Sequence, residues 1–169
     1  MKKLMLWLLV FGLTTQFYAQ VVNNGQLPEV VVTAVNYKYM NDVANGDLDS
    51  AVKSLEIEAA NFDPRNNKDL FEDEYGHYKV SFYIPDGQIV AAYDGSGKII
   101  RTIEKFKDVK PPRTVINSVT KRFPGWAIAD DVYKVTYHHK KGTNKMYKLI
   151  LENGTKSMRV KTDENGKFL

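Results

Sequence analysis

The sequence predicts an α+β fold: two tandem β-α-β-β-β units, with a largely antiparallel, curved sheet and the helices packed on one face. Two segments, 78–100 and 147–169, align without a gap at an offset of 69 residues. Their apolar side chains mostly alternate along the chain, which is the period of a strand with one buried face. A segment with helical spacing of apolar residues precedes each of them. Each amphipathic helix can therefore cover the apolar face of neighbouring strands.

The two aligned segments are YKVSFYIPDGQIVAAYDGSGKII and YKLILENGTKSMRVKTDENGKFL. Turn-forming residues divide the first at 85–87 and 94–97, and the second at 152–154 and 163–166. Asp, Asn and Gly between alternating apolar residues are typical of hairpin turns. Each segment therefore reads as strand, turn, strand, turn and the first residues of a further strand.

Helices are expected at 48–60 and 112–123, where apolar residues recur three and four positions apart. Strands are expected before each helix, at 29–37 and 98–106, and a further strand at 126–138. The apolar faces of the two helices are Ala51, Val52, Leu55 and Ala59, and Val115, Ile116, Val119 and Phe123.

The repeated unit is thus a strand, a helix and three further strands. The first unit covers 28–96 and the second covers 97–169, after a flexible N-terminal segment at 20–27. The first unit is expected to hold a longer connection at 61–76, where the spacing of the two copies differs.

The first nineteen residues read as a secretory signal peptide. Lys2 and Lys3 precede an apolar run from Leu4 to Leu13, and a polar stretch ends at Ala19. The run is shorter than the roughly 20 residues that a membrane-spanning helix needs. No second apolar run of that length follows, so no transmembrane segment is expected after cleavage. We expect a periplasmic or secreted protein. The absence of cysteine excludes a lipid anchor and disulfides.

Charge is distributed unevenly along the chain. Residues 20–97 hold 5 basic and 13 acidic side chains, a net charge of −8, whereas residues 98–169 hold 17 and 7, a net charge of +10. Such polarity can join the two halves, order contacts between copies or offer a basic face to an anionic partner. Two solvated faces of opposite charge remain an alternative.

Residues 93–169 resemble the PepSY-like domain of exported bacterial proteins, and residues 28–92 resemble it less closely. Its marks are the D-x-x-G-K turn that leads into a strand, a short helix that ends in Phe-Pro-Gly, and a final strand pair with another such turn. They stand here at Asp94–Lys98, at 123–125 and at Asp163–Lys167.

The resemblance implies a fold similar to that of β-lactamase-inhibitor proteins, with tandem units and a concave sheet face for partners. It also implies a binding module without catalytic residues. It does not imply inhibition of β-lactamases, because no inhibitory loop motif can be transferred to this chain. The inhibitors also use disulfides, and this chain has no cysteine.

Two segments are candidates for partner contact. The first mixes acidic and aromatic residues in the long connection, and the second is a basic hairpin tip. A solubilising role remains open for the first, and phosphate or an acidic partner for the second. The residues are Phe71, Glu72, Asp73, Glu74, Tyr75 and His77, and His138, His139, Lys140 and Lys141.

Metal binding and catalysis are not expected. His138 and His139 are neighbours in a predicted strand and should point to opposite faces, so they cannot bind one metal from there. The turns at Asp94 and Asp163 lack the full ligand set of a calcium loop and suit hairpins. The chain has no Cys nucleophile, Gly-x-Ser-x-Gly motif, P-loop or His-Glu-x-x-His motif. We therefore expect no cofactor.

The sequence predicts an exported, non-catalytic module that recognises a protein or peptide partner in the cell envelope, as an inhibitor or sensor. The alternative is a periplasmic binder of a small ligand or anion that uses the basic second half. Nucleic acid is not an expected partner.

Overall fold

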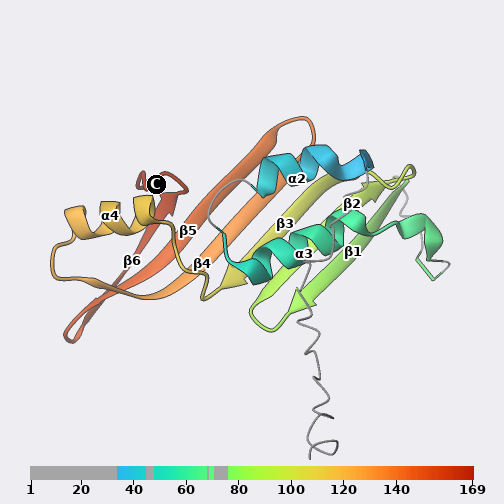
Figure 1. The fold of residues 1–169 in the computed structure, drawn as a ribbon. Coiled ribbons are helices and arrows are strands. Elements are labelled where there is room, and N and C mark those ends of the chain that lie inside the picture. Colours follow the sequence, from blue (N-terminus) through green and yellow to red (C-terminus); the bar gives the residue numbers. More distant parts are fainter. Residues whose placement is uncertain (1–33, 45–47, 68, 71–75) are drawn as a thin grey trace, which may run out of the picture.

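Figure 1 shows the protein as a computed structural model, which describes residues 34–44, 48–67, 69–70 and 76–169. Six strands form one sheet in which each strand pairs antiparallel with the next one in the chain. The predicted α+β class with an antiparallel sheet is confirmed. The strands are β1 (His77–Ile84), β2 (Gly87–Asp94), β3 (Ile99–Lys107), β4 (Ala127–His138), β5 (Gly142–Asn153) and β6 (Lys156–Asp163).

The α-helices of the described residues lie on the same side of the sheet (Figure 1). Among them, α3 contacts β1 and β2, while α2 contacts β4 and β5. The helix α4 lies against the C-terminal turn, where the Thr114 hydroxyl donates to the Glu164 carbonyl at 3.1 Å. The helices are α2 (Tyr37–Val43), α3 (Ser50–Asn61) and α4 (Arg113–Arg122), with two short 3-10 turns, η1 (Ala34–Asn36) and η2 (Pro64–Asn66).

The two predicted amphipathic helices are confirmed as α3 and α4. Asp49 caps α3, because its Oδ1 accepts from the Ala51 N–H at 2.8 Å. Pro112 precedes α4, and its fixed φ suits a helix entry. The buried residues of α3 include Val52, Leu55 and Ala59, and those of α4 are Val115 and Val119.

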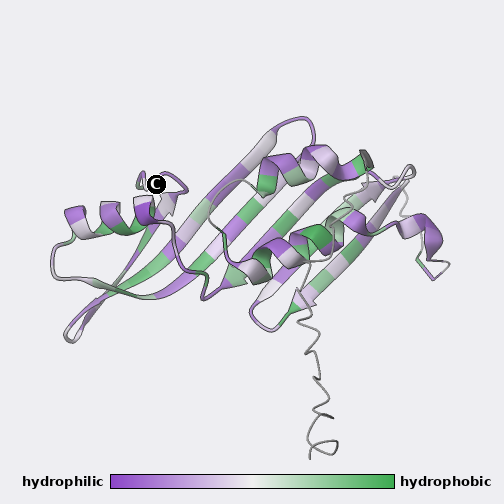
Figure 2. Cartoon of the chain, viewed as in Figure 1, coloured by the Kyte–Doolittle hydropathy of each residue, from purple (hydrophilic) through white to green (hydrophobic). Residues whose placement is uncertain are grey.

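The core lies between the sheet and the helices, and Figure 2 shows apolar and polar residues alternating along the strands. Aromatic rings fill much of it. Tyr133 stacks on Tyr147 with ring centroids 4.8 Å apart, and Phe106 lies 6.3 Å from Tyr133 on the other side. Tyr39 of α2 meets Tyr137 edge to face at 5.2 Å. Such pairs add to the free energy gained by burial.

The predicted strand at 29–37 is wrong from residue 34 onwards, because residues 34–36 form η1 and α2 follows directly. Residues 29–33 lie outside the described part of the chain. In α2, Tyr39 and Val43 are four residues apart and both are buried. This spacing places both side chains on the same face of the helix.

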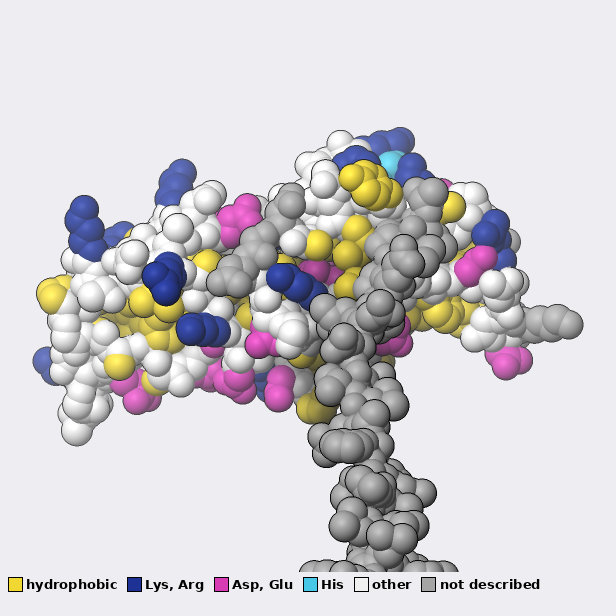
Figure 3. Space-filling model, in the orientation of Figure 1, with side chains coloured by type: hydrophobic (Ala, Val, Ile, Leu, Met, Phe, Trp, Pro, Cys, Tyr) yellow, Lys and Arg dark blue, Asp and Glu magenta, His cyan; other side chains and the backbone are white. Residues whose placement is uncertain are grey.

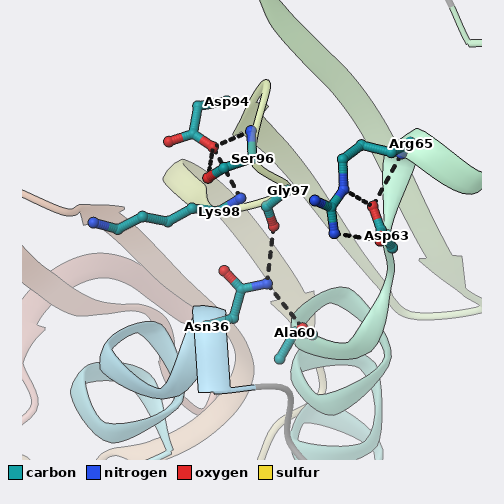
Figure 4. Close-up of polar contacts among 8 residues, drawn as sticks. All are labelled: Asn36, Ala60, Asp63, Arg65, Asp94, Ser96, Gly97 and Lys98. Carbon is teal, nitrogen blue, oxygen red and sulfur yellow. Dashed lines mark hydrogen bonds and ion pairs between the residues drawn. The ribbon is translucent and has the colours of Figure 1, made fainter.

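Asn36 holds this segment in place through contacts that are distant in sequence. Its amide Nδ2 donates to the carbonyls of Ala60 at 2.9 Å and Gly97 at 3.3 Å (Figure 4). Its Oδ1 accepts from the N–H of Ile99 at 2.8 Å. Asn36 is buried, so each of these bonds is needed to satisfy its amide group. Tertiary contacts thus override the strand propensity of the segment.

The two units differ in their elements. Residues 97–169 hold the predicted order of a strand, a helix and three strands, namely β3, α4, β4, β5 and β6. The described part of residues 28–96 instead holds η1, α2, α3 and η2, followed by β1 and β2. In the first unit η2 begins at Pro64, within the connection predicted at 61–76, and Asp63 caps it.

The turn at the end of each unit repeats closely. The Asp94 carboxylate accepts from the backbone N–H groups two and four residues later, at 2.9 and 3.0 Å (Figure 4). Asp163 does the same at 2.9 and 2.9 Å. Gly97 and Gly166 follow with φ of 82° and 81°, a region that favours glycine. Each Asp therefore serves the turn, as predicted.

The C-terminal residues begin a further strand and then end. Phe168 forms a bridge with Thr162, which is the counterpart of the pairing of Tyr93 with Ile99. Phe168 also meets Phe123 edge to face, with ring centroids 5.6 Å apart. The residues after β6 therefore fasten the end of α4 to the outer strand.

Candidate basic sheet face

The sheet face on which none of the described helices lies is called here the uncovered face. Because side chains alternate along a strand, the burial of Tyr133, Val135 and Tyr137 on the helix side turns Lys134 to the other face. The strand register extends this assignment across the sheet. The basic side chains of the uncovered face are Lys79, Arg101, Lys105, Lys107, Lys134, Lys148, Arg159 and Lys161.

Acidic side chains on the uncovered face are fewer and lie towards strand ends. By the same register they are Asp94, Asp130, Glu152 and Asp163. Asp94 and Asp163 already accept hydrogen bonds within their turns. On the helix-bearing face, by contrast, basic and acidic side chains are both present between apolar ones (Figure 3).

Two pairs of like charges stand directly opposite each other on the uncovered face. Lys105 of β3 faces Lys134 of β4, and Lys148 of β5 faces Lys161 of β6. Like charges at such positions destabilise a sheet. Among the described residues, the ion pairs are formed by Lys38, Arg65 and Lys145, and none includes these four lysines. No ion pair of the described residues offsets this repulsion.

A second group of ionisable residues is buried beneath α2 and α3. Glu56 of α3 and Glu104 of β3 are 0% and 1% exposed. Tyr39 Oη donates to Glu104 Oε1 at 3.0 Å, and Thr102 Oγ1 donates to the same atom at 2.6 Å. Neither carboxyl oxygen of Glu56 accepts a hydrogen bond from the described residues. The Lys145 side chain, 5% exposed, lies 3.5 Å from the exposed Glu164 carboxylate.

Burial decides the protonation of these carboxyl groups. Burial, together with the nearby Glu104, raises the pKa of Glu56 to about 8, against an opposing effect of Lys145. Burial likewise raises the pKa of Glu104, although the hydroxyls of Thr102 and Tyr39 favour its ionised form. Because solvent does not reach either group, this pair belongs to the core and is no surface for a substrate.

The segment expected to contact partners is only partly within the described chain. Phe71, Glu72, Asp73, Glu74 and Tyr75 lie outside it. His77, which belonged to the same candidate segment, is the half-buried first residue of β1 and faces Asp94 of β2.

The basic hairpin tip is present between β4 and β5, with Lys140 and Lys141 exposed. His138 and His139 do not point to opposite faces, and that expectation is wrong. β4 ends at His138, so His139 already lies in the turn, and the two rings stack 5.3 Å apart at 12°. The Lys140 N–H donates to Nδ1 of His138 at 3.1 Å. Desolvation and the positive neighbours lower the pKa of His138.

In the part of the chain that the structure describes, no three His, Asp or Glu side chains group closely enough to hold a metal ion. A scan against protein-family models, a search of curated proteins and a search of solved structures each found no match for this chain. Within the described residues, no helix has the length and apolar character needed to cross a membrane. The function proposed below therefore rests on the geometry of the uncovered face.

Sequence reasoning missed the buried carboxyl groups of Glu56 and Glu104 and the basic side chains of the uncovered face, although the sequence holds signals for each. In the predicted strand at 98–106, alternation places Glu104 on the side of Thr102 and Phe106, which is the buried side. Glu56 likewise falls four residues after Val52, on the apolar face of its helix. The basic face does not show in the net charges of 20–97 and 98–169, because side chains of one strand alternate between the two faces of the sheet.

Proposed function

We propose that this protein is an exported, non-catalytic binding module of the PepSY-like type. Its uncovered face binds an acidic segment of a protein or peptide partner in the cell envelope. Export rests on the signal-peptide pattern of residues 1–19, and the family assignment rests on the turn and helix motifs of residues 93–169.

The observation that carries this proposal is the pairing of Lys105 with Lys134 and of Lys148 with Lys161 on a face without a described helix. A strand that only needed solubility would gain from opposite charges at these positions. An acidic ligand laid across the strands offsets both repulsions at once. Complementary charge also raises the rate of encounter and selects against basic partners.

The test compares the binding of poly-L-glutamate with wild type and two double variants of equal charge. Lys105→Gln with Lys134→Gln changes the uncovered face. Arg113→Gln with Lys121→Gln changes exposed residues of α4 and serves as the control. Affinity at low salt should fall by about tenfold or more in the first variant and little in the second. Equal effects of the two variants would contradict a specific role of the uncovered face.

A further inference from the structure

A depression of about 290 Å³ opens across β4, β5 and β6. This volume is near the lower end of the range for small-ligand pockets. Six side chains that line it point to the uncovered face and stand in two neighbouring rows of the sheet. The rows are Val132, Lys148 and Lys161, and Asp130, Ile150 and Arg159.

Three cations of this depression can meet at one point. Lys148 and Lys161 are directly opposite, which places their Cβ atoms about 5 Å apart. Arg159 is opposite Ile150 and is therefore the diagonal neighbour of Lys148, about 7 to 8 Å away. Long side chains bridge such distances, so one carboxylate can contact all three. None of the three belongs to an ion pair within the described residues.

The floor between these charges is apolar. Val132 stands beside Lys148, and Ile150 stands between Asp130 and Arg159, and both apolar residues are half-buried. Asp130 and Arg159 are two strand spacings apart, or about 10 Å, so the carboxylate does not neutralise the guanidinium directly. Asp130 is instead an acceptor on the far side of the depression from the cations.

We propose that the depression binds the C-terminal carboxylate of a peptide that ends in an aliphatic residue. The carboxylate lies among Lys148, Lys161 and Arg159, and the last side chain covers Val132 and Ile150. A backbone N–H of the peptide donates to Asp130.

This inference rests on the proposed function and adds that the protein recognises the C-terminal end of the acidic peptide. A free fatty acid fits less well, because it has no N–H for Asp130.

Fluorescence anisotropy tests this with an acidic peptide that carries an N-terminal dye and ends in Gly-Val-Leu. The same peptide is made with a free carboxylate and with a C-terminal amide. Wild type should bind the free carboxylate about tenfold more tightly than the amide, because the amide loses its charged hydrogen bonds. In Arg159→Gln and Lys161→Gln this preference should fall to about twofold or less.

Lys105→Gln is the matched control, since Lys105 lies on the uncovered face outside the depression. This variant should weaken the binding of both peptides equally and leave the ratio of their two affinities unchanged. If the amide binds wild type as tightly as the carboxylate, while Lys105→Gln weakens both, the subsite is wrong and the proposed function stands. Hexanoate that binds as tightly as the free-carboxylate peptide also overturns the subsite, because hexanoate has no N–H for Asp130. Failure of both peptides at low salt overturns both proposals.

Discussion

At the residue scale, the most consequential group is a carboxyl that the fold keeps away from water. The carboxyl oxygens of Glu56 accept no hydrogen bond from the described residues, and burial and the nearby Glu104 raise the pKa of Glu56. A neutral Glu56 is the state that this site tolerates, because an ionised carboxylate would be buried next to another carboxyl group. The folded protein therefore keeps a proton on Glu56 at pH values at which the unfolded chain releases it.

The folded-state pKa of about 8 against an ordinary 4.5 makes stability depend on pH. The contribution of Glu56 to the free energy of unfolding should be largest below about pH 4.5 and should fall as pH rises towards 8, since the unfolded chain then releases the proton more readily. Glu56→Gln should raise the free energy of unfolding by about 2 to 4 kcal/mol at pH 8 and change it little at pH 4. Urea unfolding of wild type and variant across this range measures the difference.

The exposed Glu58 of the same helix is the matched control, and Glu58→Gln should leave the pH dependence as it is in wild type. A loss of stability at pH 8 in Glu56→Gln would show that an ionised Glu56 is useful to the fold, through Lys145.

At the element scale, the repeated turn shows how a unit ends against its helix. Gly166 has a φ of 81°, and a Cβ there would lie 2.4 Å from the Ser118 hydroxyl and 2.7 Å from the Thr114 carbonyl of α4. Backbone conformation and close packing thus both require glycine. Gly142 has the same φ of 81°, but a Cβ there would meet nothing within 4 Å.

A comparison of Gly142 with Gly166 separates the effect of backbone conformation from the effect of close packing. Gly142→Ala should cost about 1 kcal/mol of unfolding free energy, from the left-handed conformation alone. Gly166→Ala should cost about 2 to 4 kcal/mol, because α4 must also move away from the turn. Urea unfolding gives both values. Equal losses in the two variants would mean that the turn does not need its close contact with α4.

The elements that local pattern determines were predictable, and those that distant contacts determine were not. Residues 50–61 and 113–122 are helical where apolar spacing predicts helices. The segment at Asn36 is not a strand, because its partners lie 24, 61 and 63 residues away. The opposition of Lys148 and Lys161 follows from the two-residue turn between Asn153 and Lys156 and was accessible to sequence reasoning.

At the scale of the whole molecule, the binding that we propose for the uncovered face competes with stability. The helix side supplies an aromatic core, while the other side holds lysines directly opposite each other that form no ion pair with a described residue. The register between β3 and β4 that sets Lys105 against Lys134 spans the intervening helix α4, so no single turn fixes it. A face that binds an acidic partner keeps these repulsions when it is free and loses them when it is occupied.

Lys161→Glu tests this competition in one change, because it turns the repulsion with Lys148 into a cross-strand ion pair. The variant should gain about 0.5 to 1 kcal/mol of unfolding free energy at low salt, and the gain should shrink at high salt. Its affinity for poly-L-glutamate should fall at the same time. Lys156→Glu makes the same change of charge on the same strand, but opposite the neutral Asn153, and should not gain stability. A stability gain in both variants, or an affinity that survives Lys161→Glu, would contradict the opposition of binding and stability on this face.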